Sequence, residues 1–395
     1  MEIRTLRASE LDRAFDLDAD AFHAPEERRE LWRTRMDPAR IVGAFQGDRL
    51  LAMTNVLEFG QYFGKRAVPM GGLASVAVVP DARGGGLAGR VIQRCLEEMR
   101  DRGEAISSLF PATTSLYRTW GWELGGSYGL RRVSARRLRE VPRPAGGASR
   151  PLRPEDWPGV CACYADFATD VNGCLERRES SWERKRFLWR DRDAYVFEDA
   201  QGAIRGYLFY RQVDGAHSQL GGDFDLVVDD WAATTRDAAL GLLRMLGDWC
   251  SQVDAITLRG GGDHPVLLVL PEQVFDPLAE IRWMTRVVDP EAAVAERGFP
   301  AGLDLEVPLQ LHDDAWPATR GDFVLSVQKG RGALARAAST AGPRLDVNGF
   351  SSLFTGWAGS AALARAGRLT GGSADERAAL DAAFGGPTPW MAEEF

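Results

Sequence analysis

The chain contains very little lysine, histidine and cysteine for its length of 395 residues. Only Lys65, Lys185 and Lys329 are lysines, so nearly every positive charge is an arginine. The four histidines are scattered without the spacing of metal ligands, and we expect no metal site. The five cysteines are odd in number and widely spread, which argues against a disulfide framework and indicates a reducing compartment.

Long hydrophobic runs are also missing. No stretch approaches the roughly 18 apolar residues of a membrane span, and the first residues do not form the apolar run of a signal peptide. The 48 basic and 56 acidic residues give a net charge of -8, which argues against nucleic acid or an anionic membrane as a partner. We therefore expect a soluble, cytoplasmic protein whose acidic surface suits a small cationic substrate.

Three segments can be separated along the chain. A Pro/Gly/Ala stretch at 143–147 ends the first segment, and the second opens as the first does, with a short strand and a capped acidic helix start. Each of the two also contains a predicted hairpin, which suggests two copies of one α/β fold. A third segment begins near Asp289 and ends in Pro, Trp, Met and Phe, which predicts a docked tail. The predicted domains are 1–145, 146–288 and 289–395.

The most informative stretch is a predicted strand, glycine loop and helix in the first segment. The strand at 73–79 stops at Pro80, and Arg83-Gly84-Gly85-Gly86 follows. From Leu87 onward, apolar side chains recur with the spacing of one helical face. Free backbone N–H groups and the helix dipole favour an anion at such a loop, so the pattern predicts a phosphate or pyrophosphate site.

The same glycines also satisfy the spacing of a dinucleotide-binding motif, with Gly84, Gly86 and Gly89. That motif requires its first glycine to follow the strand directly, whereas four residues intervene here. The next predicted strand should end in an acidic residue for the ribose, yet Pro111 follows it. A nicotinamide or flavin site is the weaker interpretation.

A second rival motif lies near the N-terminus. Acidic residues at 16, 18, 20 and 27 resemble the spacing of a calcium-binding loop. The position that needs glycine is Ala21, and Pro25 interrupts the loop. A solvated helix face explains this spacing better.

The glycine loop carries a resemblance to a known family. Arg83-x-x-Gly86-x-Ala88 resembles the pyrophosphate motif of the GCN5-related N-acetyltransferases (GNATs), and residues 116–122 resemble their Tyr-x-x-x-Gly-aromatic segment. Together with the three-segment plan and the aromatic C-terminus, the chain is similar to the enhanced intracellular survival (Eis) acetyltransferases. The resemblance implies an α/β (α+β) fold class: two tandem GNAT folds with mixed central sheets, the second degenerate, and a C-terminal sterol-carrier-like α+β domain.

The resemblance also implies a chemistry and the residues that perform it. Acetyl-CoA is the expected co-substrate and a primary amine the acceptor, with Tyr117 as general acid and the terminal carboxylate of Phe395 as general base. An alkylamine has a pKa of roughly 8–10, so it must lose a proton before it can attack. The expected cofactor-binding residues are Val76, Ala77, Val78, Arg83, Gly84, Gly85, Gly86, Leu87 and Ala88.

For the acceptor, the resemblance points to Phe22 and Trp32 as aromatic pocket residues, with Glu394 drawing a cation. The family acetylates aminoglycosides and forms homo-hexamers. An acidic pocket residue of the family corresponds to Ala24 here, which leaves polyamines, lysine side chains and other cationic amines open.

A different class of function also fits the sequence. The chain is alternatively a non-catalytic CoA- or lipid-binding protein in which the acetyltransferase folds have lost their chemistry. The first segment, however, keeps the glycine loop and Tyr117, and the chain keeps the terminal Phe395. We therefore expect an enzyme whose active domain is the first one.

Overall fold

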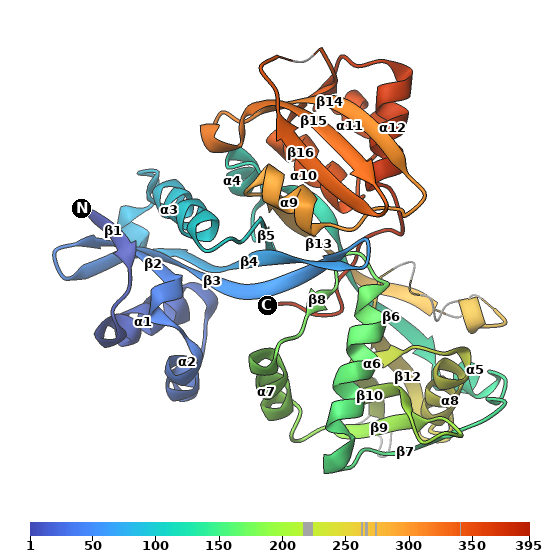
Figure 1. The fold of residues 1–395 in the computed structure, drawn as a ribbon. Coiled ribbons are helices and arrows are strands. Elements are labelled where there is room, and N and C mark those ends of the chain that lie inside the picture. Colours follow the sequence, from blue (N-terminus) through green and yellow to red (C-terminus); the bar gives the residue numbers. More distant parts are fainter. Residues whose placement is uncertain (216–223, 262–263, 265–267, 273–274, 340) are drawn as a thin grey trace.

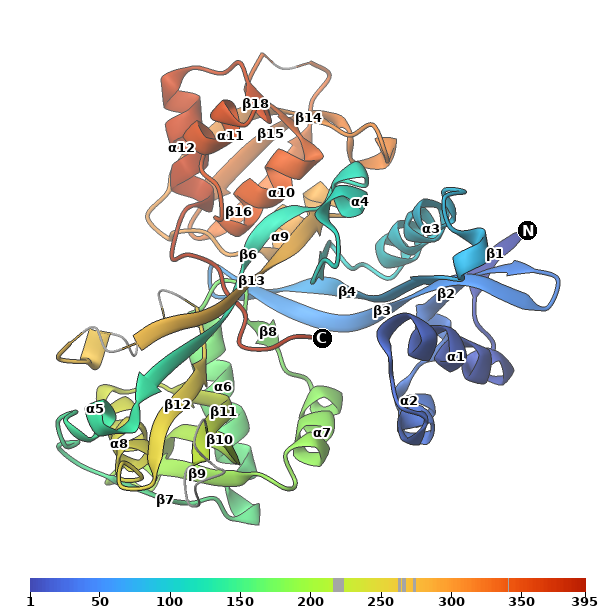
Figure 2. The ribbon, with the colours of Figure 1, turned by 180° about the vertical axis from the view of Figure 1, so that it is seen from behind.

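A computed structural model describes residues 1–215, 224–261, 264, 268–272, 275–339 and 341–395. Two of its lobes share one large sheet, and a third lobe with its own sheet packs against them (Figures 1 and 2). The blue N-terminal lobe and the green middle lobe lie side by side, and the orange-to-red lobe covers the strands that join them. The chain therefore has the three-part organisation expected from the sequence.

The first lobe is a mixed sheet with helices on both faces. α1 and α2 pack on one face, and α3 packs on the other through its apolar stripe. Its elements are β1 (Glu2–Thr5), α1 (Leu11–Phe22), α2 (Arg29–Arg35), β2 (Ile41–Gln46), β3 (Arg49–Phe63), β4 (Arg66–Val78), α3 (Leu87–Asp101), β5 (Ile106–Leu109), α4 (Thr114–Thr119), β6 (Glu123–Ser134) and α5 (Ala135–Arg139).

The second lobe repeats this order of elements, from an edge strand through a helix and a hairpin to a parallel strand pair. Its elements are β7 (Ala148–Pro151), α6 (Trp157–Thr169), β8 (Leu175–Glu176), α7 (Glu179–Leu188), β9 (Asp193–Glu198), β10 (Ile204–Asp214), β11 (Phe224–Ala233), α8 (Arg236–Gly247), β12 (Val253–Arg259) and β13 (Phe275–Val287).

The two lobes exchange strands. The shared sheet has the order β1-β2-β3-β4-β5-β13-β6-β12-β11-β10-β9-β7, with β8 paired to β3. β13, from the end of the second segment, lies between β5 and β6 and is antiparallel to both. β6 in turn pairs with β12 of the second lobe. The first lobe's sheet is therefore completed by a strand that follows it by more than a hundred residues, and the limits at 145 and 288 stay predictions.

The third lobe is a separate sheet covered by helices. The strand order is β16-β15-β14-β17-β18, and α10 packs against both β6 and β13 of the shared sheet. Its elements are α9 (Pro290–Glu296), β14 (Asp304–His312), β15 (Gly321–Gln328), β16 (Arg331–Arg336), β17 (Arg344–Asp346), α10 (Val347–Thr355), α11 (Ser360–Arg365), β18 (Leu369–Thr370) and α12 (Ala374–Phe384).

The stripe of α3 shows why the glycine loop is held firmly. Leu87, Val91, Ile92, Leu96 and Met99 recur every three or four residues and are all buried against the sheet. Each such side chain contributes about 1.5–3 kcal/mol when it is withdrawn from water. Burial of this stripe fixes the position of the helix, and with it the loop at its N-terminus.

The described residues offer neither a membrane-spanning helix nor a grouped set of metal ligands. None of their helices is long and apolar enough to cross a bilayer. Within the same ranges, no cluster of three or more histidine, cysteine, aspartate or glutamate side chains is arranged to hold a metal ion.

Candidate active site

The sheet of the first lobe opens between β4 and β5. The two parallel strands pair only as far as Gly72 and Ser108. β4 nevertheless continues to Val78, whereas β5 ends at Leu109. Within the described ranges, the edge of β4 from Leu73 onward that faces β5 has no strand partner. Its backbone N–H and C=O groups can therefore bind an extended ligand.

A β-bulge interrupts β4 just after this opening. The pairing of β4 with β3 skips from Ala74 to Ala77, so Ser75 and Val76 together oppose one residue of β3. Ser75 has φ 53°, in the left-handed region that residues other than glycine rarely adopt. The irregularity frees backbone groups at Ser75 and Val76 from the β3 ladder, directly beside the opening.

The glycine loop lies beyond the end of β4 and is exposed to solvent. Gly84 and Gly86 have φ 81° and 72°, and no atom lies within 4 Å of a Cβ added at either position. Glycine is therefore required by backbone conformation and not by crowding. The Arg83 Nε atom donates a hydrogen bond of 3.1 Å to the Val78 carbonyl oxygen. Since α3 begins at Leu87, its first N–H groups meet this loop and form an anion site of the kind expected.

Tyr117 lies on α4, on the same face of the sheet as α3. Its side chain is 7% exposed and belongs to the core cluster that contains Leu73 and Leu109, and its ring lies 6.4 Å from that of Trp122. Burial raises the pKa of the Tyr117 hydroxyl, which therefore stays protonated at neutral pH. Among the described residues this hydroxyl has no hydrogen-bond partner, so its proton is available to a ligand.

The third lobe holds the C-terminal end of α4. The Asn348 side chain, at the start of α10, donates hydrogen bonds of 2.9 Å to the carbonyl oxygens of Arg118 and Trp122. These carbonyl groups lie on either side of the turn that ends α4, where the Arg118 oxygen also accepts a hydrogen bond of 3.2 Å from the Gly121 N–H. The position of Tyr117 is therefore linked to a residue more than 200 positions away in the chain.

The glycine of the Tyr-x-x-x-Gly-aromatic segment, Gly121, is required for a different reason: a buried side chain lies directly against it. Gly121 has φ 88°, and a Cβ added there would lie 1.5 Å from Nη1 of Arg286, a fully buried side chain of β13. Arg286 donates to the Trp120 carbonyl oxygen and forms a 2.5 Å ion pair with Asp313. Any larger residue at 121 would displace this guanidinium group, so the segment depends on both the exchanged strand and the third lobe.

The C-terminal tail runs back across the shared sheet and does not fray. The Ser127 N–H of β6 donates to the Pro389 carbonyl oxygen over 3.1 Å, and the Met391 N–H donates to the Ser127 carbonyl oxygen over 2.9 Å. Trp390 and Met391 are buried. The docked tail predicted from the aromatic last residues is therefore present, and it ends between the first and second lobes (Figures 1 and 2).

Phe395 ends at the opening of the sheet. Its ring lies 5.0 Å from that of Phe59 and 5.6 Å from that of Phe110. A Cβ added to Gly72, the last residue of β4 that pairs with β5, would lie 2.7 Å from the Phe395 ring. Successive residues of a strand face opposite sides, and the neighbouring Leu73 shares its cluster with Tyr117. Tyr117 and Phe395 therefore approach the opening from opposite faces of the sheet.

The three residues expected to bind the acceptor are less closely gathered. Phe22 lies at the end of α1 and is 52% exposed, whereas Trp32 is partly buried and packs on Phe15 at 5.8 Å. In the part of the chain that the structure describes, no ring contact joins Phe22 to another aromatic side chain. Glu394 is exposed beside the chain terminus.

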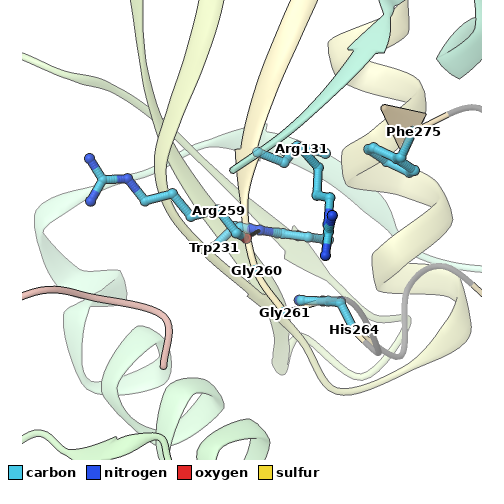
Figure 3. A pocket seen from close by; sticks show the side chains of 8 residues that line it. Arg131, Trp231, Arg259, Gly260, Gly261, His264 and Phe275 are labelled. Carbon is cyan, nitrogen blue, oxygen red and sulfur yellow. Dashed lines mark hydrogen bonds between the residues drawn. The ribbon is translucent and has the colours of Figure 1, made fainter. Parts of the chain in front are cut away.

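The equivalent opening in the second lobe is closed by side chains. β11 and β12 stop pairing at Val228 and Leu258, and the indole N–H of Trp231 then donates to the Arg259 carbonyl oxygen over 2.8 Å. The His264 ring stacks on Trp231 at 4.4 Å with an interplanar angle of 6°. A small pocket lies beside these rings and is lined also by Arg131 and Phe275 (Figure 3).

The residues before α8 also differ from the glycine loop. Thr235 caps α8 by accepting a hydrogen bond from the Ala238 N–H, and its neighbours are Ala233, Thr234 and Arg236. A capped helix start without glycines leaves no nest of N–H groups for a pyrophosphate. Of the two lobes, the first has the features that a CoA ester requires.

Sequence reasoning missed the residues that hold the site together. Asn348 and Arg286 carry no local motif, because each acts on a segment more than 160 residues away. A buried arginine cannot be recognised from its neighbours in the sequence, since arginine is mostly a surface residue. The only available signal was Gly121, whose conformation requires a close neighbour that the sequence does not identify.

An opened mixed sheet with a glycine loop at a helix N-terminus is typical of the acetyltransferase (GNAT) class of enzymes. Comparison with known proteins agrees. Residues 2–125 and 173–287 each match the model of an acetyltransferase (GNAT) domain, and residues 290–392 match a sterol carrier protein domain.

Similar proteins span nearly the whole chain. The N-acetyltransferase Eis of Mycobacterium tuberculosis is 26% identical, over 91% of this chain and 90% of that protein. The crystal structure of a GCN5-related N-acetyltransferase from Kribbella flavida is 30% identical, with a TM-score of 0.87 over 100% of this chain and 98% of the other. Eis1 of Mycobacterium abscessus, 24% identical over the full length of both chains with a TM-score of 0.81, shares the fold. The chain belongs to the GCN5-related N-acetyltransferase family, and it is similar to the Eis enzymes over most of its length.

Proposed function

We propose that this N-acetyltransferase moves the acetyl group of acetyl-CoA to a primary amine of a small cationic acceptor such as an aminoglycoside. The observation that carries the proposal is that Tyr117 and Phe395 lie on opposite faces of the sheet at the opening between β4 and β5, where β4 has a free edge and a glycine loop beyond it. Acetyl-CoA supplies an acyl group activated as a thioester.

The residues of the first lobe suit the two ends of such a co-substrate. The loop from Arg83 to Ala88 offers N–H groups, a helix dipole and one guanidinium group to the pyrophosphate. The free edge of β4 at Val76, Ala77 and Val78 offers a ladder to the amide groups of the pantetheine arm. The bulge at Ser75 turns backbone groups out of the β3 ladder, where an N–H can polarise the thioester carbonyl.

Two groups then handle the protons. The carboxylate of Phe395 takes a proton from the acceptor's ammonium group, and the freed nitrogen bonds to the acetyl carbon as the carbon–sulfur bond breaks. Tyr117, protonated because it is buried, donates its hydroxyl proton to the departing sulfur. The acylated nitrogen loses its second proton to solvent, the Phe395 carboxyl group releases the first one there, and the Tyr117 phenolate takes one back. The products are the N-acetyl amine, the free thiol and one proton.

Fewer residues support the proposed class of acceptor than support the use of acetyl-CoA. Glu394, Phe22 and Trp32 offer one negative charge and two aromatic faces to a cation. The same side also carries arginines: Arg35 of α2 lies 4.5 Å from the ring of Phe187 on α7, and Arg190 lies 4.2 Å from that ring. A panel of acceptors therefore needs an amine that bears a carboxylate beside the polycations.

The first experiment follows thiol release from acetyl-CoA with an aminoglycoside, spermidine, a lysine peptide and a free amino acid. We expect turnover with one class of amine, reduced at least about tenfold by Tyr117→Phe or by removal of Phe395. Tyr195→Phe, a tyrosine of β9 remote from the opening, serves as the matched control. Absence of thiol release with every amine, together with no binding of acetyl-CoA by calorimetry, would overturn the proposal.

Compartment and assembly are part of the same proposal. All five cysteines are free thiols, which supports a cytoplasmic, reducing environment. The homo-hexamer implied by the family resemblance is tested by light scattering on the purified protein, where a monomer mass would count against it.

A further inference from the structure

We infer that the second lobe, which lacks a glycine loop, serves to position the catalytic C-terminus through an ion-pair lock on Glu393. The inference rests on the proposed role of the Phe395 carboxylate. Arg177 and Lys185 of the second lobe are then positioning residues, because they act on the reaction only through the tail.

The lock is a buried group of four charged side chains. Arg177 contacts Asp230 of β11 through two hydrogen bonds of 2.7 Å, and its Nε atom donates to Glu393 over 2.8 Å. The Nζ atom of Lys185, on α7, contacts the other carboxylate oxygen of Glu393. All four side chains are at most 8% exposed.

Aromatic groups of the second lobe complete the cage. The guanidinium carbon of Arg177 lies 3.6 Å from the centre of the Tyr164 ring, a close cation–π contact. The hydroxyl of Tyr207 donates to Asp230 over 2.7 Å. Arg177 is therefore held in place independently of the tail, and its Nε atom is aimed at the position that Glu393 occupies.

The charges of the lock balance only when the tail supplies a carboxylate. Arg177 and Lys185 carry two positive charges, whereas among the described residues of the second lobe Asp230 is the one carboxylate paired with this group. The neighbouring Asp229 cannot help, because its carboxylate contacts three other arginines, Arg192, Arg211 and Arg259. An uncompensated buried cation is costly, so Glu393 is required to neutralise the site.

The lock is built on β11, the strand of the second lobe that corresponds to β4 of the first lobe. β11 corresponds to β4, since each pairs antiparallel with the preceding hairpin strand and parallel with the following strand. Each carries a bulge just after its parallel pairing stops, at Ser75 in β4 and at Asp229 in β11. In the second lobe, the residue next to the bulge is Asp230, which holds Arg177. β11 therefore has the same bulged geometry as β4, but the residue beside its bulge holds the arginine that binds the C-terminal tail.

The lock is close enough to control the terminal carboxylate. Glu393 is two residues before Phe395, and two residues span at most about 7 Å. The Phe395 ring is held by Phe59 and Phe110, and Glu394 between the two anchors faces solvent. With Glu393 on one side and the ring on the other, the carboxylate has little freedom to move, which is what a positioned base requires.

The test compares Glu393→Gln with Asp156→Asn in the full-length chain. Asp156 is a matched control, because it is a buried carboxylate of the same lobe, paired to Arg150 at 2.6 Å, and does not contact the tail. A carboxypeptidase probes the tail directly, since a mobile C-terminal phenylalanine is cleaved and a held one is protected. Thiol release gives kcat and the KM for acetyl-CoA.

We expect Glu393→Gln to lose Phe395 to the carboxypeptidase at least about tenfold faster and to lower kcat by a similar factor, with KM for acetyl-CoA within about twofold of the parent. Asp156→Asn should match the parent in both assays. A double variant, Glu393→Gln with Lys185→Met, removes one charge of each sign. It should recover part of the protection, and it replaces the single variant if that variant does not fold.

Two outcomes separate this inference from the proposed function. Parent-like protection and kcat in both Glu393 variants would overturn the positioning role. Rapid loss of Phe395 with unchanged turnover would support the lock but overturn the assignment of the terminal carboxylate as the base.

Discussion

The two acetyltransferase lobes have the same strand pair at their centre, and they use it in opposite ways. In the first lobe, β4 and β5 separate and leave a free edge next to a glycine loop. In the second lobe, β11 and β12 separate at the equivalent point, but Trp231 and His264 fill the space and a threonine cap replaces the loop. The comparison teaches that the fold alone does not make a CoA site; the groups placed at the opening do.

The largest expected effect comes from opening the closed lobe. Trp231→Ala removes the indole that bridges to the Arg259 carbonyl oxygen and stacks on His264, so we expect a loss of about 3–5 kcal/mol in the free energy of unfolding. It should not create a second cofactor site, because no glycine loop precedes α8. Denaturant titration measures the first effect, and calorimetry should still give one acetyl-CoA per chain. A stoichiometry of two would contradict the comparison.

The next effect depends on pH. Although burial opposes ionisation, Arg177 and Lys185 lower the pKa of Glu393 from an ordinary 4.5 to about 2. The unfolded chain then binds the proton more readily than the folded one, so the contribution of Glu393 is complete above about pH 4.5 and is lost as the pH falls toward 2. At neutral pH this amounts to about 3 kcal/mol. Unfolding curves of the parent and of Glu393→Gln should therefore differ at pH 7 and converge near pH 2; a constant difference would argue against the pairing.

A smaller effect is expected at the glycine loop. Valine in place of Gly86 must adopt φ 72° at the start of α3, which costs about 1–3 kcal/mol for a β-branched residue or moves the N–H groups out of place. We expect the KM for acetyl-CoA to rise about tenfold or more. Thr235→Ala at the equivalent place in the second lobe should cost about 1 kcal/mol of stability and leave KM unchanged. Equal effects of the two substitutions on KM would make the lobes equivalent, against the comparison.

The smallest effect concerns the brace on α4. Asn348→Ala removes the donor of the Trp122 carbonyl oxygen and one of the donors of the Arg118 carbonyl oxygen, and it should cost about 1–2 kcal/mol. Because Tyr117 lies on α4, kcat should fall a few-fold while the KM for acetyl-CoA stays constant. Ser352→Ala, which removes a hydrogen bond of the same helix to the Leu124 carbonyl oxygen, is the control. If both variants lower kcat equally, the brace has no special connection to Tyr117.

Local patterns in the sequence predicted the local parts of this structure. The strand, glycine loop and α3 could be predicted because glycine conformation and helical periodicity are properties of neighbouring residues. The docked tail followed from its apolar residues. The insertion of β13 between β5 and β6 could not be predicted, since antiparallel pairing leaves no mark on either strand that identifies its partner.

The charged groups were the least predictable part. Arg177 and Glu393 are 216 residues apart, and arginine and glutamate are residue types that usually lie at the protein surface. What makes them functional is their burial, which depends on the tail crossing β6 at Ser127. The roles given to Tyr117 and Phe395 came from a family resemblance and stay predictions until their variants are assayed.

The exchanged strand sets a limit on how this protein can be divided. A fragment that ends near residue 145 would lack β13, and β5 and β6 would each present an open edge in the middle of a sheet. The second lobe has no glycine loop, yet without it the first lobe would lack the strand that joins β5 to β6. The second lobe is therefore a structural part of the first lobe's sheet, whatever chemistry its own opening supports.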